Sequence, residues 1–123
     1  MLIYDTLSGE KKELIQPKLF GVFKKPIRMF VCGPTVYDNP HIGNARTFVF
    51  FDMFVKYLRS RGFNIFYLQN ITNIEDKIIQ RAIDEGTTWD KIADKFEQVF
   101  YDYNKRLCIT SVDTFPKSTD FIP

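Results

Sequence analysis

The stretch IRMFVCGPTVYDNPHIGN, residues 27–44, decides the fold of this chain. Its first residues are largely apolar and predict a strand over 27–32 that ends at Cys32, after which a Gly-Pro turn leads into a helix. In open α/β sheets, ligands bind at the carboxyl ends of strands, where helix N-termini present free N–H groups to anions. This strand-to-helix junction is therefore a candidate site for a phosphate and a thiol.

The junction gathers residue types that suit such a site. His41 can donate a hydrogen bond to phosphate oxygens, and Gly43 has no Cβ to keep a nucleotide away from the backbone. Asn44 can cap the helix or bind a ligand, and the thiolate of Cys32 can coordinate a metal. Taken singly, each of these residues is more often structural than functional, so only their combination indicates a function.

Several blocks of the chain resemble the cysteinyl-tRNA synthetases. CGPTVYD (32–38) followed by HIGNAR (41–46) is similar to the signature of that family, and HIGN resembles the "HIGH" motif of class I aminoacyl-tRNA synthetases. YLQNITNIEDK (67–77) is similar to the next family block, and LIYDTLS (2–8) resembles the family N-terminus. The resemblance identifies residues 1–123 as the N-terminal portion of one catalytic, nucleotide-binding domain.

This resemblance implies an ATP-dependent ligase that activates cysteine to cysteinyl-adenylate and then transfers the cysteinyl group to tRNA. It makes His41 and Asn44 catalytic residues that stabilise charge at phosphorus, and it adds Thr35 and Gly43 to the ATP-binding residues. Mg²⁺ is expected on the ATP phosphates. The acceptor end of the tRNA is expected to bind mostly to regions outside this chain.

The resemblance also implies a zinc ion that selects the thiol of cysteine. Cys32 corresponds to one zinc ligand, and Cys32, Gly33 and Thr72 correspond to cysteine-binding residues. Zinc prefers a thiolate to a serine hydroxyl, which stays protonated at neutral pH. The remaining ligands (a Cys, a His and a Glu) are expected downstream, since His41 is the only histidine and Cys108 does not match.

Some features depart from the family pattern. The chain contains no Lys-Met-Ser-Lys-Ser loop and no anticodon-reading domain, so alone it is expected to be inactive. Asn73 and Glu75 stand where Asp is usual. PKSTDFI (116–122) resembles the family's P-R-A-T-x-H-I, with Phe121 in the place of His.

Two alternatives stay open at the level of sequence. A mycothiol-type ligase would activate cysteine identically but pass it to an amino sugar, and it shares the strand-end Cys and the His-x-Gly motif. A truncated paralogue would bind a nucleotide or a protein without catalysis, which the altered 116–122 block favours. Dependence on tRNA and cysteine-dependent turnover distinguish the three functions.

The composition describes a folded chain of ordinary charge. Of its 123 residues 45% are hydrophobic and 13 are Phe, which excludes a disordered protein. A net charge of +2 gives no strong electrostatic case for nucleic acid. Two cysteines far apart in sequence suit a reducing compartment, and no apolar run is long enough to span a bilayer. We therefore expect a cytoplasmic protein without a membrane partner, and the resemblance implies a monomer.

The order of the predicted elements indicates an α/β fold. A helix over 44–61, closed by Gly62, separates the strand at 27–32 from a strand at 63–70, and such a βαβ unit is parallel. No G-x-G-x-x-G or P-loop motif is present. The resemblance therefore implies the N-terminal half of the Rossmann-like nucleotide-binding fold of class I synthetases, a parallel sheet with flanking helices.

The remaining patterns concern helices and packing. A helix over 75–85 is closed by Gly86, and Thr87 or Thr88 caps a final helix whose apolar stripe predicts core. That stripe consists of Trp89, Ile92, Ala93, Phe96, Val99, Phe100, Tyr103 and Leu107.

Two expectations complete the set. A short strand at 2–4 is expected to pair with 13–15. The 44–61 helix is apolar nearly all round, which predicts burial on more than one side. Its additional apolar faces carry Val49, Phe50, Phe54 and Tyr57.

Overall fold

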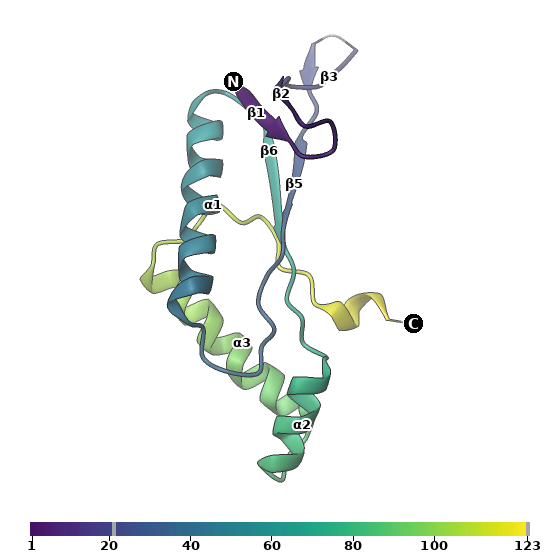
Figure 1. The fold of residues 1–123 in the computed structure, drawn as a ribbon, viewed down its shortest axis with the longest axis vertical. Coiled ribbons are helices and arrows are strands. Elements are labelled where there is room, and N and C mark those ends of the chain that lie inside the picture. Colours follow the sequence, from purple (N-terminus) through teal and green to yellow (C-terminus); the bar gives the residue numbers. More distant parts are fainter. Residues whose placement is uncertain (21, 123) are drawn as a thin grey trace.

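The computed structural model describes residues 1–20 and 22–122. Its centre is a pair of strands, β5 (Ile27–Val31) and β6 (Ile65–Gln69), which are parallel along their whole length. Helix α1 (Ile42–Ser60) connects the two strands and lies along one side of the pair (Figure 1). The predicted parallel βαβ unit is confirmed.

Residues 113–118 extend this sheet as a third parallel segment beside β6. The amide of Gln69 donates to the carbonyl of Thr114 (3.1 Å), and the amide of Ile71 donates to the carbonyl of Pro116 (2.8 Å). The sequence does not predict this segment, because it carries no alternating pattern and contains a proline. The sheet therefore has β6 at its middle.

Helix α1 begins two residues earlier than predicted because His41, and not Asn44, is its N-cap. Its predicted end is right: Gly62 follows the cap with φ of +83°, the left-handed region that glycine favours. The buried residues of the helix form one stripe, and they are Phe48, Asp52, Val55 and Leu58.

The prediction that α1 is buried on more than one side is wrong for the residues that the structure describes. Val49, Phe50 and Tyr57 are 41%, 53% and 50% exposed, and Phe54 is half-buried. An apolar face of a helix is therefore buried only where another element packs against it.

Two small hairpins precede the central strands. β1 (Leu2–Asp5) pairs antiparallel with β2 (Glu10–Glu13), so the predicted hairpin is present but its second strand lies before 13–15. β3 (Lys18–Leu19) and β4 (Phe23–Lys24) form a second, unpredicted pair.

Helices α2 (Asp76–Asp84) and α3 (Trp89–Arg106) pack against each other at the far end of the molecule (Figure 1). Gly86 follows α2 with φ of +62°, and Thr88 occupies the N-cap of α3, as predicted. A short 3₁₀ helix, η1 (Ser118–Phe121), follows the third parallel segment. Among the described residues, no helix is long and apolar enough to cross a membrane.

The stripe on α3 is core, as predicted, except at its ends. Phe100 packs edge-to-face on Phe48 of α1 with ring centroids 5.7 Å apart, while Trp89 and Leu107 are exposed. The buried members of this cluster are Val36, Phe48, Ile71, Ile78, Ala82, Ile92, Ala93, Phe96, Phe100 and Ile109. A second cluster, between α1 and the strands, consists of Val31, Val55, Leu58, Ile65 and Tyr67.

A buried carboxylate fastens the segment after α3 to α1. Asp52 Oδ1 accepts the amides of Thr110 and Ser111, both at 2.8 Å, and Oδ2 lies 2.6 Å from Lys56 Nζ. Burial alone would raise the pKa of Asp52, but the hydrogen bonds from Lys56 and from Ser111 hold that pKa below its usual value. The ionised carboxylate therefore stabilises the fold.

Replacing Asp52 by Asn should lower the free energy of unfolding at pH 7 by about 1–3 kcal/mol, because two backbone amides and Lys56 lose an ionised acceptor. The folded-state pKa lies below the unfolded value of about 3.9. The stabilisation is therefore complete above that value and is lost as pH falls through the folded pKa. Urea unfolding of both chains across the acid range measures this difference.

The matched control for this measurement is Asp102→Asn, since Asp102 is exposed on α3. It should leave the free energy of unfolding nearly unchanged. An equal loss in both variants, or a loss in Asp52→Asn that does not shrink in acid, would contradict the role of Asp52.

Candidate functional site

The candidate site lies where three parallel segments end. The loop of residues 32–41 follows β5, residues 70–75 follow β6, and η1 follows the third segment. The loops still pair beyond the strands: the amide of Thr72 donates to the carbonyl of Pro34 (3.0 Å), and the amide of Val36 donates to the carbonyl of Thr72 (3.1 Å). The sequence prediction placed the site at this edge of the sheet, and the structure brings these segments together there.

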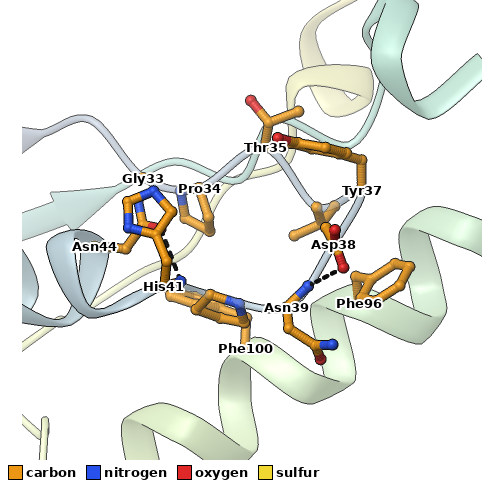
Figure 2. Close-up of a pocket in the computed structure, with 12 residues that line it drawn as sticks. Gly33, Pro34, Thr35, Tyr37, Asp38, Asn39, His41, Asn44, Phe96 and Phe100 are labelled. Atoms are coloured by element: carbon orange, nitrogen blue, oxygen red, sulfur yellow. Dashed lines mark hydrogen bonds between the residues drawn. The ribbon is translucent and has the colours of Figure 1, made fainter.

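His41 and Asn44 form a reciprocal cap at the start of α1 (Figure 2). The amide of Gly43 donates to His41 Nδ1 (3.1 Å), and the amide of His41 donates to Asn44 Oδ1 (3.2 Å). Because Nδ1 accepts, the proton of the neutral imidazole is on Nε2. His41 is therefore held with a hydrogen-bond donor on the side of the ring away from the cap.

Gly43 is required by this cap. A Cβ at position 43 would lie 2.9 Å from both Cε1 and Nδ1 of His41, closer than carbon atoms normally approach. The space beside Gly43 is thus filled by the His41 ring. This contact gives a reason for glycine that differs from the predicted approach of a nucleotide.

A cavity of about 230 Å³ lies inside the loop after β5. Of the predicted site residues, Gly33, Thr35, His41 and Asn44 line it, and Figure 2 shows Phe96 and Phe100 of α3 across from them. The predicted residues Cys32, Gly43 and Thr72 do not line this cavity.

The first turn of α1 carries no acidic side chain. The amides of Gly43, Asn44 and Ala45 are bonded to His41, so the donor that this helix start presents is His41 Nε2–H, and it meets no competing carboxylate from its own helix. Such an arrangement favours an anionic group at the mouth of the loop.

Cys32 is an exposed free thiol, with Sγ 3.7 Å from the carbonyl oxygen of Gly33. Within residues 1–20 and 22–122, no three His, Cys, Asp or Glu side chains come together in a group that could hold a metal ion. Cys108 is also an exposed free thiol, with φ of 55° in the loop after α3.

Two residues that hold the site were not singled out by sequence reasoning. Asn70 bonds to both Gly33 and Thr72, although it lies in the quoted 67–77 block. Arg81 of α2 donates to the carbonyl of Tyr37 (2.9 Å) and so ties the loop to the helix. No sequence signal connects Arg81 with this loop, since their separation is 44 residues.

The same arginine lies beside a carboxylate of the loop. Arg81 Nη1 is 3.1 Å from Asp38 Oδ1. The backbone amide of Asn39, and after it Arg81, lowers the pKa of Asp38 below its ordinary value. The loop is thus held in place by a charged side chain that stays ionised at neutral pH.

Asn73 and Lys117, which differ from the usual residues of the family, both make side-chain contacts in the structure. Asn73 is buried; its Nδ2 donates to Thr119 Oγ1 (2.7 Å) and its Oδ1 accepts the amide of Thr119 (3.1 Å). Lys117 Nζ lies 2.7 Å from Glu97 Oε2, and the hydrogen bond with Glu97 raises the pKa of Lys117. Phe121, in contrast, is 76% exposed.

Comparison with known proteins agrees with this arrangement. The family model described as "tRNA synthetases class I (C) catalytic domain" matches residues 20–123. The cysteine–tRNA ligase of Pyrococcus abyssi is 42% identical over 120 residues, which are 98% of this chain and 24% of that protein. The cysteine–tRNA ligase of Paraburkholderia xenovorans is 43% identical over 121 residues, which are 98% of this chain and 25% of that protein. The chain thus spans about a quarter of the length of these curated relatives.

Solved structures agree on the fold. Mycobacterium tuberculosis methionyl-tRNA synthetase bound by methionyl-adenylate superimposes with a TM-score of 0.73 at 24% identity, covering 79% of this chain and 19% of that one. This likeness confirms the Rossmann-like α/β fold of class I synthetases. With a family model over most of its length and relatives above 40% identity, the chain belongs to the family of class I (C) tRNA synthetase catalytic domains.

Proposed function

We propose that the protein to which these residues belong is a cysteine–tRNA ligase, which activates cysteine with ATP and transfers it to tRNA. The curated relatives that cover nearly the whole chain carry that name. The structural observation that carries the proposal is the cap in which His41 Nδ1 accepts the amide of Gly43, because it leaves a donor ready at a helix N-terminus. Residues 1–123 would be the N-terminal portion of the catalytic domain.

In the first step, the cysteine carboxylate would attack the α-phosphate of ATP and release pyrophosphate. His41 Nε2–H and the Asn44 amide would stabilise negative charge as it grows at phosphorus, and the positive end of α1 adds to this field. Thr35, which lines the cavity, would complete the contacts to ATP, and Gly43 would serve the ATP site by leaving room for the His41 ring. Bound with ATP, Mg²⁺ would supply positive charge that offsets the charge of the phosphates.

Cysteine would bind beside ATP at the strand ends, against Cys32, Gly33 and Thr72. Cys32 is proposed as one ligand of a zinc ion, but the described residues alone do not fit a zinc site, because they bring no second and third ligand to it. The other ligands would come from outside these residues. We further propose that the ligase works in the cytoplasm as a monomer.

The function is tested by cysteine-dependent exchange of pyrophosphate with ATP in the whole protein, followed by transfer of the cysteinyl group to tRNA. Exchange and transfer to tRNA are the expected results. Transfer to an amino sugar instead would support a mycothiol-type ligase. Binding of ATP without cysteine-dependent exchange would contradict catalysis and support a nucleotide-binding paralogue.

His41→Asn separates the cap of α1 from the proposed chemistry. Asparagine is a good N-cap and should keep the helix start, whereas its amide does not reach as far as Nε2. We expect the exchange rate to fall about 100-fold, as for the loss of one donor to a developing charge, with little change in thermal stability.

His41→Ala is the matched comparison, since it loses both the cap and the donor. It should lose activity to a similar degree and also about 1 kcal/mol of stability. A near-normal exchange rate in His41→Asn would show that the His41 imidazole does not contribute to the reaction.

Cys32→Ser should remove zinc from the whole protein and lower its preference for cysteine over serine, because a hydroxyl is a poor zinc ligand at neutral pH. Zinc per chain is measured by elemental analysis, and the preference by exchange with each amino acid. Cys108→Ser is the control, and it should keep both properties. Full zinc occupancy in Cys32→Ser would refute the assignment of this ligand.

A further inference from the structure

Asn70 joins the two strand ends that carry the proposed cysteine-binding residues. Its side chain is partly buried just beyond β6. Oδ1 accepts the backbone amide of Gly33 (3.0 Å), next to Cys32, and Nδ2 lies 3.3 Å from Thr72 Oγ1. One side chain thus contacts the backbone after β5 and the hydroxyl after β6.

The direction of these two bonds is fixed by the first one. The backbone amide of Gly33 only donates, so it must face the oxygen of the Asn70 amide. The NH₂ group of Asn70 therefore faces Thr72, and Thr72 Oγ1 accepts from it. The hydroxyl proton of Thr72 is left to donate to another acceptor.

The backbones leave no room for a different spacing. A Cβ on Gly33 would lie 1.6 Å from the carbonyl oxygen of Asn70 and 2.8 Å from its carbonyl carbon. Only glycine allows this approach. The Asn70 side chain therefore bridges the ends of β5 and β6 at a place where their backbones cannot come closer.

We propose that Asn70 is a positioning residue for cysteine binding: it fixes the Gly33 backbone against Thr72 and turns the Thr72 hydroxyl into a donor toward the substrate. This inference rests on the proposed function. Asn70 acts through Gly33 and Thr72, which are the hydrogen-bond partners of its side chain. It does not act through His41, which caps α1. Its loss should therefore weaken cysteine binding and leave ATP binding unchanged.

The test compares Asn70→Ala and Asn70→Asp in the whole protein. Asn70→Ala should raise the KM for cysteine about tenfold and leave the KM for ATP within about twofold, since the hydrogen bonds to Gly33 and Thr72 are lost. Asn70→Asp keeps the acceptor for Gly33, but its ionised carboxylate would accept a hydrogen bond from the Thr72 hydroxyl, which could then no longer donate to the substrate. It should therefore raise the KM for cysteine as Asn70→Ala does.

The matched control is Asn64→Ala, at the opposite end of β6. Asn64 also bonds to the backbone of another segment, since its Nδ2 donates to the carbonyl of Lys24 (3.1 Å). This variant should leave both KM values unchanged. Equal effects on cysteine and ATP in Asn70→Ala, or a normal KM for cysteine in Asn70→Asp, would overturn the inference.

Hydrogen exchange of the Gly33 amide separates this inference from the proposed function. The amide should be protected in the wild type and in Asn70→Asp, and it should exchange faster in Asn70→Ala. An unprotected Gly33 amide in the wild type would overturn the inference even if the protein activates cysteine. A whole protein that does not activate cysteine would overturn the proposed function, whatever the exchange of Gly33 shows.

Discussion

The close approach of Gly33 to the carbonyl of Asn70 is the constraint on which the site depends. Parallel strands usually separate once their pairing ends, but here the segments continue side by side, with Thr72 bonded to the backbone at Pro34 and Val36. A Cβ on Gly33 would overlap the Asn70 carbonyl at 1.6 Å, so any other residue would push the two ends apart. The relative placement of Cys32, Thr35 and Thr72 follows from that contact. The loop that leads to α1 starts from this fixed point, and Arg81 holds its middle.

At the start of α1, one residue both caps the helix and carries the proposed chemistry. His41 is an unusual N-cap, and it caps through Nδ1, which is possible only while that nitrogen carries no proton. Capping therefore selects the tautomer that presents Nε2–H, and the ring packs beside Gly43. A donor held by its own helix needs little reorganisation when charge develops beside it. The same geometry explains why the helix begins at Ile42 and why Asn44, a good cap by residue type, instead accepts the His41 amide.

Local patterns made much of the fold predictable, and long-range contacts account for what was not. Gly62 and Gly86 end helices through their backbone conformation, and the periodicity of α3 reflects the burial of one face. Both features depend on residues close together in sequence, so the sequence alone predicts them. The candidate site could be predicted from the sequence because a strand, a turn and a helix start are adjacent there. Asp52 looks like a polar residue on an apolar helix, and its role depends on amides 58 and 59 residues away. The third parallel segment is likewise defined only by its pairing with β6, and the exposed faces of α1 depend on what packs against them.

Asn73 stands where the family usually has Asp, and this substitution preserves the contacts of the residue at the edge of the proposed site. An aspartate there would accept both the amide and the hydroxyl of Thr119, whereas Asn73 accepts the amide and donates to the hydroxyl oxygen. The connection to η1 is kept, and only the direction of one bond is reversed. Thr119 therefore keeps its hydroxyl proton, as Thr72 does beside Asn70. Replacing a carboxylate by an amide also removes one negative charge from the edge of the sheet. The proposed site would hold a triphosphate and a carboxylate together, and there the loss of charge would reduce repulsion, so the substitution at position 73 does not argue against the proposed function.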